Sequence, residues 1–153
     1  MAYRFDSLYI GGAWVKPSTT DVLTLENPAT RAPFATVPDA TPADAVAAIE
    51  AAASALPAWS ATPLAKRVEL RQKALESFKT YRDEIIRLEA LELGAPVSYS
   101  ANAHCDYQFT RIESYIRESQ KVVLEEQFEQ STVVREPIGV IACITPVSYT
   151  HLT

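Results

Sequence analysis

The residues of this chain best suited to covalent chemistry are its two cysteines, because a thiolate is a strong nucleophile. Cys105 stands between His104 and Asp106, a grouping that looks like a nucleophile with a base and an acid beside it. Neighbouring residues of a helix point in different directions, so these three side chains cannot form a nucleophile–base pair with one another. Packing or helix-surface roles are therefore favoured for all three.

Cys143 lies in an apolar run from Ile138 to Ile144, where a cysteine behaves as a small buried hydrophobic residue. The two cysteines do not have the spacing of a metal site, and the sequence predicts no metal ligand. So few cysteines, without a disulfide pattern, indicate a reducing, cytoplasmic setting.

Length and charge restrict the classes of protein to consider. The 153 residues fit one domain with a real core, and the net charge is -5 without a cluster of Lys and Arg. A nucleic-acid surface needs such a cluster to neutralise phosphates, so no nucleic-acid partner is expected. No apolar stretch is long enough to span a bilayer, so no membrane partner is expected either.

The first forty residues are expected to form strands. Gly11 and Gly12 stand between two short apolar runs and predict the turn of a hairpin. Val22 to Glu26 is the next strand candidate, and Asn27-Pro28 ends it, because the residue before a proline is pushed out of the helical region. A further short strand is expected from Phe34 to Val37.

Helices follow, beginning at Thr41-Pro42-Ala43-Asp44. Thr41 can cap the helix, Pro42 suits its first position, and Asp44 favours the positive end of the helix dipole. This helix is expected to end at Pro57. Its apolar face comprises Val46, Ile49, Ala53 and Leu56.

Two further helical regions are expected, from Leu64 to Gly94 and from Val97 to Val123. A break near Thr80 to Arg82 is expected in the first, since an uninterrupted helix would exceed the usual length. The apolar stripe of the first region is Leu64, Val68, Leu75 and Phe78. The buried side of the second is marked by Phe109, Ile112, Tyr115 and Ile116. Glu125 and Glu126 are interpreted as a solvated helix face.

After the helical regions, the spacing of the apolar residues changes to one that is typical of β-strands. Ser131 to Arg135 predicts one strand, and Ile138 to Ile144 predicts a second after Pro137. The second run is apolar on both faces, as in a parallel strand that helices cover on both sides.

Together these elements resemble the N-terminal part of an aldehyde dehydrogenase, over residues 5 to 146. The matching pieces, in order, are Leu8-Tyr9-Ile10-Gly11-Gly12 with Trp14-Val15, Asn27-Pro28-Ala29-Thr30, Ala43 to Leu56 with Trp59, Glu89 through Gly94-Ala95-Pro96, and Arg135-Glu136-Pro137-Ile138-Gly139-Val140 leading to Ile144-Thr145-Pro146. Each piece alone is weak, and the ordered set is strong.

The resemblance implies an α/β fold, the N-terminal part of a Rossmann-like subunit several times longer than this chain. It implies a β-hairpin, a helical layer, an arm strand near Ser131 to Arg135 and the first strand of the cofactor sheet. Such subunits oxidise a small-molecule aldehyde to a carboxylic acid with NAD or NADP through a cysteine thiohemiacetal, and they form homo-oligomers. Ile144, Thr145 and Pro146 would then line the cofactor, at the carboxyl end of a strand.

The sequence departs from the family pattern directly after Pro146. Val147 and Ser148 stand where the family has Trp and an Asn that stabilises the oxyanion. The family's catalytic Cys and Glu would lie beyond Thr153, so no catalytic residue is assigned in this chain and the fragment is expected to be inactive. Residues 147–153 match one reading frame of a sequencing adaptor and are expected to be a non-native tail, with residues 1–146 as the native portion. Arg31 stands where the family has Gly.

Three alternatives stay open. The chain could be a small non-enzymatic module that binds a partner or dimerises. The parent enzyme could instead be a CoA-acylating dehydrogenase or an acyl-phosphate reductase, whose distinguishing residues would lie downstream. A less favoured hypothesis gives Asp106 a part in a structural cation site, although such a site needs several oxygen ligands.

Overall fold

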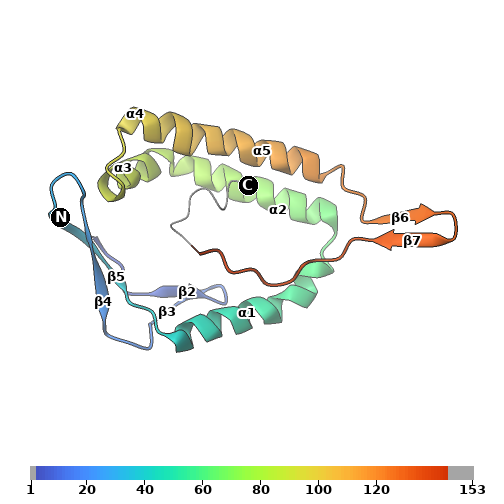
Figure 1. Cartoon of the computed structure of the whole chain (residues 1–153), viewed down its shortest axis with the longest axis horizontal. Helices are drawn as coiled ribbons and strands as arrows, with labels where there is room; N and C mark the ends of the chain where they lie inside the picture. The colour runs from blue at the N-terminus through green and yellow to red at the C-terminus, as the bar shows by residue number, and fades with distance from the viewer. Residues whose placement is uncertain (1–2, 145–153) are drawn as a thin grey trace.

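The computed structural model describes residues 3–144. Its elements form two layers, with α1 and the β2–β3 hairpin on one side and α2, α3 and α5 on the other (Figure 1). The segment after β7 runs between the layers, and the β6–β7 hairpin projects from one end. The mixture of strands and helices agrees with the expected α/β class. Within the described residues, no helix is long and apolar enough to cross a membrane.

The N-terminal strands form a small sheet and a separate hairpin. The sheet has the order β1-β5-β4, from Tyr3–Arg4, Pro33–Pro38 and Val22–Glu26, with β1 parallel and β4 antiparallel to β5. The hairpin joins β2, Leu8–Ile10, to β3, Ala13–Val15. Its turn residues Gly11 and Gly12 have φ of 62° and 82°, a left-handed backbone that glycine adopts without a Cβ clash. The predicted hairpin and strands are confirmed.

The turn between β4 and β5 places a bulky residue in the same left-handed region. Asn27 Oδ1 accepts from the N–H of Ala29 at 2.9 Å and of Thr30 at 3.1 Å, and the Arg31 N–H donates to the Asn27 carbonyl at 2.7 Å. Arg31 has φ of 58°, where a side chain costs on the order of 1 kcal/mol relative to glycine. The turn therefore keeps the geometry of a glycine turn without the glycine.

Helix α1, Pro42–Ser60, begins at the predicted cap. The Thr41 hydroxyl and the Asp44 backbone and side chain form a capping box, and Asp44 also accepts from the Ser18 N–H at 3.0 Å and hydroxyl at 2.9 Å. The backbone N–H of Thr41 is the largest of the contacts that hold the pKa of Asp44 below its usual value. This cap joins the β3–β4 loop to the helix start.

The expected end of α1 at Pro57 is wrong. Pro57 lies inside the helix, which continues to Ser60, and the Ala61 N–H donates to the Pro57 carbonyl at 3.1 Å. Proline removes one N–H donor and crowds the carbonyl four residues before it, but Pro57 is exposed and its own carbonyl still accepts a hydrogen bond. The last turn can therefore close around it.

The helical layer contains α2, Leu64–Thr80, α3, Arg82–Glu92, the short α4, Val97–Tyr99, a π-helical segment η1, Ser100–Asp106, and α5, Tyr107–Ser119. The predicted break falls at Tyr81, between α2 and α3. The third predicted region ends four residues before Val123, at Ser119. Its π-helical portion was not anticipated.

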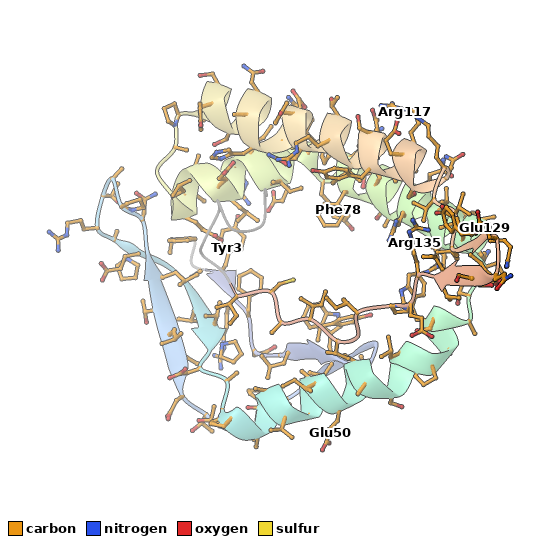
Figure 2. All side chains as sticks on the ribbon, turned by 45° about the vertical axis from the view of Figure 1, so that its right-hand side comes forward. Tyr3, Glu50, Phe78, Arg117, Glu129 and Arg135 are labelled. Atoms are coloured by element: carbon orange, nitrogen blue, oxygen red, sulfur yellow. The ribbon has the colours of Figure 1, made fainter. Side chains whose placement is uncertain are left out.

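Helices α2 and α5 pack through a small core. Val68, Leu75 and Ile116 are buried, with Leu64 and Phe109 partly buried against them. Three residues of the predicted stripes lie outside this core, because Phe78 is 59%, Tyr115 is 60% and Ile112 is 39% exposed. Phe78 points towards the side of the molecule that holds α1 (Figure 2), where it lines a shallow hollow together with Ile112 and Tyr115 of α5.

The last two strands form an isolated hairpin, β6, Glu125–Phe128, with β7, Ser131–Val134. The predicted strand at Ser131 is confirmed, whereas the interpretation of Glu125 and Glu126 as a helix face is wrong. Arg135 explains part of the difference, since its guanidinium pairs with Glu126 across the hairpin and donates to the Val123 carbonyl.

The predicted strand from Ile138 to Ile144 does not form. These residues are not part of a β-strand, Gly139 has a φ of 115°, and Cys143, expected to be buried within the strand, is exposed. A strand that is apolar on both faces needs strands paired at its edges, and none of the sheets among the described residues includes this run. Thr145, Pro146 and residues 147–153 lie outside the described residues.

Much apolar surface stays uncovered. The chain exposes 11665 Å², whereas a folded monomer of this mass exposes about 7,700 Å². The expected apolar face of α1 is part of the excess, because Val46 and Ile49 are both more than half exposed. The described elements therefore leave apolar faces exposed to solvent.

We expect Leu75→Ala to lower the free energy of unfolding by about 2–5 kcal/mol, because it leaves a cavity in the α2–α5 core. The matched variant Phe78→Ala, one turn along α2, should change it by about 0.5 kcal/mol or less, since that ring is exposed. Urea titration followed by helical circular dichroism measures both. Equal effects of the two substitutions would contradict the assigned core.

We also expect the start of α1 to lose stability in acid. The lowered pKa of Asp44 contributes stability that is present above its unfolded value of about 3.9 and is lost as the pH falls through the folded value. The melting temperature should fall across this range, and Asp44→Asn should flatten that dependence. Glu50→Gln is the control, since Glu50 points outward from α1 (Figure 2). If the melting temperature depends on pH in the same way for the wild type and for Asp44→Asn, the role of the cap is refuted.

Candidate functional site

The residues predicted to line a cofactor lie at the end of the described chain. Ile144 is in the segment after β7 and its side chain is 74% exposed, while Thr145 and Pro146 lie outside the described residues. The exposed Ile144 side chain can contact a ligand but supplies no charge or hydrogen bond for a phosphate. The assignment of these three residues stays a prediction.

The grouping of His104, Cys105 and Asp106 lies in η1, and its three side chains separate as expected. His104 Nδ1 contacts Glu89 of α3, and the His104 ring lies edge-on to Tyr99, with centroids 4.8 Å apart. Asp106 accepts from Arg82 Nε at 2.6 Å and Nη2 at 2.7 Å. Cys105 is 2% exposed. The partners of His104 and Asp106 are thus on α3.

The electrostatics of this cluster do not suit a nucleophile. Burial raises the pKa of the Cys105 thiol, with the charge of Arg82 acting in the opposite direction, so the thiol stays protonated at neutral pH. The hydrogen bonds from Arg82 hold the pKa of Asp106 below its usual value. The cluster is therefore an ion-paired contact between α3 and η1.

A cation site at Asp106 is not supported. Both carboxylate oxygens of Asp106 already accept from Arg82. From residue 3 to residue 144, no group of three or more His, Cys, Asp or Glu side chains could hold a metal ion.

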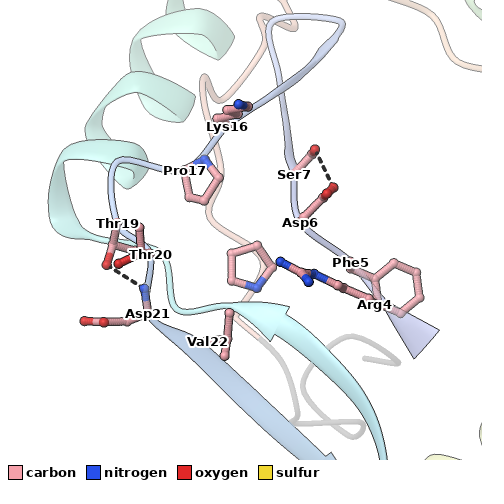
Figure 3. A pocket seen from close by; sticks show the side chains of 11 residues that line it. Arg4, Phe5, Asp6, Ser7, Lys16, Pro17, Thr19, Thr20, Asp21 and Val22 are labelled. Atoms are coloured by element: carbon pink, nitrogen blue, oxygen red, sulfur yellow. Dashed lines mark hydrogen bonds between the residues drawn. The ribbon is translucent and has the colours of Figure 1, made fainter. Parts of the chain in front are cut away.

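A surface hollow of about 370 Å³ lies where the N-terminal residues pass the β3–β4 loop (Figure 3). Arg4 and Lys16 line it together with Asp6 and Asp21, so its charges balance. Ser7 donates to Asp6 at 3.0 Å, and the Asp21 N–H donates to Thr19 Oγ1 at 3.0 Å. Its mixed charges give no preference for an anion or a cation, and it contains no cysteine or histidine.

Sequence reasoning missed Arg82 and Glu89, the partners of Asp106 and His104. They are 24 and 15 residues away along the chain, so no local pattern connects them. It also missed the π-helical winding. The spacing of five residues between Ser100 and Cys105, both small and buried, is the one signal that could have indicated it.

Comparison with known proteins gives one consistent family. The model of the aldehyde dehydrogenase family matches residues 14–152. A putative aldehyde dehydrogenase of Staphylococcus saprophyticus is 29% identical over 143 residues, covering 94% of this chain and 30% of that protein. The glutarate-semialdehyde dehydrogenase of Pseudomonas putida is 32% identical, covering 90% and 30%.

Solved structures agree with these relatives. A Mycobacterium tuberculosis aldehyde dehydrogenase complexed with NAD+ superposes with a TM-score of 0.83 at 32% identity, over 90% of this chain and 30% of that one. The chain therefore spans about 30% of the length of the curated relatives it matches.

We expect the two thiols to differ strongly in reactivity. Cys143 is exposed and should react with iodoacetamide at the rate of a free thiol, whereas Cys105 should react only after unfolding, because it is buried and its pKa is raised. Peptide mass spectrometry assigns each label. Cys143→Ser should abolish the fast phase and Cys105→Ser should preserve it. Fast labelling of Cys105 in the folded chain would contradict the assigned burial.

Proposed function

Because the chain belongs to the aldehyde dehydrogenase family, we propose that it forms the N-terminal part of a subunit that oxidises an aldehyde to a carboxylic acid. The observation that carries this proposal is the ordered match over nearly the whole chain, in sequence and in fold. NAD or NADP is the proposed hydride acceptor. The named relatives support a small-molecule aldehyde as the substrate class.

We propose that neither cysteine of this chain is the nucleophile of that reaction. A nucleophilic thiol needs a lowered pKa and access to substrate. Cys105 has the opposite properties, and Cys143 lies in the run expected to become a covered strand of the cofactor sheet. The catalytic Cys and the general-base Glu are then supplied by residues beyond this chain. Ile144, Thr145 and Pro146 are proposed to form one wall of the cofactor site.

The arrangement of the remaining elements is consistent with this assignment. The excess exposed surface is what a piece of a larger fold leaves when its neighbours are absent. The β6–β7 hairpin is proposed as an arm that pairs with another subunit in a homo-oligomer, and its projecting strand edges suit that use.

The cysteine pattern supports a reducing, cytoplasmic setting. Residues 147–153 are proposed to be a non-native tail.

The first alternative is a small non-enzymatic module that binds a partner or dimerises, which the projecting hairpin and the uncovered helix faces favour. The reading frame in the source genome distinguishes the two. Continuation after Pro146 with Trp-Asn and a later Cys-centred motif supports the enzyme, whereas a genuine stop codon after Thr153 supports the module.

We expect the 153-residue chain to produce no NADH or NADPH from short aldehydes, because the proposed nucleophile and base are outside it. The polypeptide encoded by the continued genomic reading frame should produce NADH or NADPH with at least one of them. Absorbance of the reduced nicotinamide measures both. Steady turnover by the short chain would overturn the assignment of catalytic residues, and an inactive long polypeptide would overturn the proposed oxidation.

Adding CoA or phosphate to the same assay distinguishes simple oxidation from the reaction of an acylating dehydrogenase or an acyl-phosphate reductase. If reduced nicotinamide forms only when CoA or phosphate is present, the parent enzyme is an acylating dehydrogenase or an acyl-phosphate reductase. Turnover that is independent of both supports simple oxidation to the acid.

A further inference from the structure

The π-helical segment η1 is the least ordinary part of the described backbone. Most π-helical turns occur singly within α-helices, whereas η1 extends over seven residues, Ser100–Asp106. Its hydrogen bonds join residues five apart, which brings side chains with that spacing nearly into line. Ser100 and Cys105 accordingly are both buried, at 0% and 2% exposure, where η1 packs on α3.

An α-helical winding of the same residues would separate these two side chains. Five residues of an α-helix turn through about 500°, which leaves side chains five apart about 140° from each other. Phe109 and Ile116 hold α5 against α2, so the end of η1 that joins α5 is the fixed end. Cys105, about one turn before Phe109, would keep facing inward, and Ser100 would turn out of its buried position.

Two ion pairs from α3 favour the π-helical winding. Arg82 makes two hydrogen bonds to Asp106, and Glu89 contacts His104. The first pair fixes the end of η1 next to α5. The second lies two residues further from that end, where a change of winding begins to rotate side chains away from α3.

Two buried oxygens oppose this winding. The Ser100 hydroxyl and Glu89 Oε2 are buried, and no described residue hydrogen-bonds to either. Burying such groups without a partner is unfavourable. Rewinding would return the Ser100 hydroxyl to water. The ion pairs therefore favour the π-helical winding, whereas the cost of burying polar oxygens favours the α-helical one.

We propose that Ser100–Asp106 is a register switch, anchored next to α5 by the Arg82–Asp106 pair, held in its π-helical winding by the Glu89–His104 pair, and rewinding to an α-helix when these pairs are broken. The change moves the start of α4 and the loop before it. Gly94 in that loop packs so closely on the β4–β5 turn that a Cβ would lie 2.9 Å from Pro28 Cγ. The switch therefore links α5 to the N-terminal sheet.

The test uses two thiols as reporters in the full 153-residue chain. Cys143→Ser removes the exposed thiol, and Ser100→Cys places a near-isosteric reporter beside the natural Cys105. The releasing substitutions are Arg82→Gln with His104→Gln. We expect iodoacetamide labelling of the reporter at position 100 to accelerate by about tenfold or more, while Cys105 keeps its slow rate. Peptide mass spectrometry separates the two sites.

Arg87→Gln is the matched control, since it removes the same kind of side chain from α3, where Arg87 pairs with Glu84 and not with η1. It should leave both rates unchanged. The exchanged pair Glu89→His with His104→Glu should restore slow labelling when combined with native Arg82. If both thiols accelerate together, the segment unfolds instead of rewinding, and the proposal is wrong. Unchanged labelling at position 100 would refute it equally.

Discussion

Apolar surface that the described residues leave uncovered is the constraint on which the rest of this structure depends. The exposed area is about one and a half times that of a folded monomer of the same mass. The α1 face, the Phe78 ring and the run from Ile138 to Ile144 all contribute to it. Each is apolar because a neighbour is expected there, and each stays exposed because the described residues do not provide that neighbour. The same constraint explains why a strongly apolar run is not part of a β-strand.

Two contacts give the helical layer its shape in spite of that constraint. The α2–α5 core is apolar and small, with Leu75 and Ile116 at its centre. The contact between α3 and η1 is different in kind, since it combines buried small residues with the ion pairs of Arg82 and Glu89. Dispersion and apolar burial hold the first, whereas charge-assisted hydrogen bonds fix the winding and register of the second.

Membership of the aldehyde dehydrogenase family follows from many weak matches in order, and not from a catalytic side chain. The proposed cofactor wall lies in the run that ends at Ile144, and none of the sheets among the described residues includes that run. Burial of Cys105 removes the one grouping that looked catalytic in the sequence. Within the described residues, ion pairs stand where the sequence suggested a nucleophile, and the proposed cofactor wall and arm would make this chain a scaffold.

The sequence by itself determined the features whose physics acts over a few residues. The Thr41–Asp44 cap, the Gly11-Gly12 turn, the break at Tyr81 and the separation of His104, Cys105 and Asp106 all follow from local backbone geometry and short hydrogen bonds. The tertiary structure decided whatever needed a distant partner. It left Phe78 exposed, let α1 continue through Pro57, paired Glu126 with Arg135 in a hairpin, and wound Ser100–Asp106 as a π-helix against α3. Burial and pairing are properties of two surfaces that meet, and a sequence pattern describes only one of them.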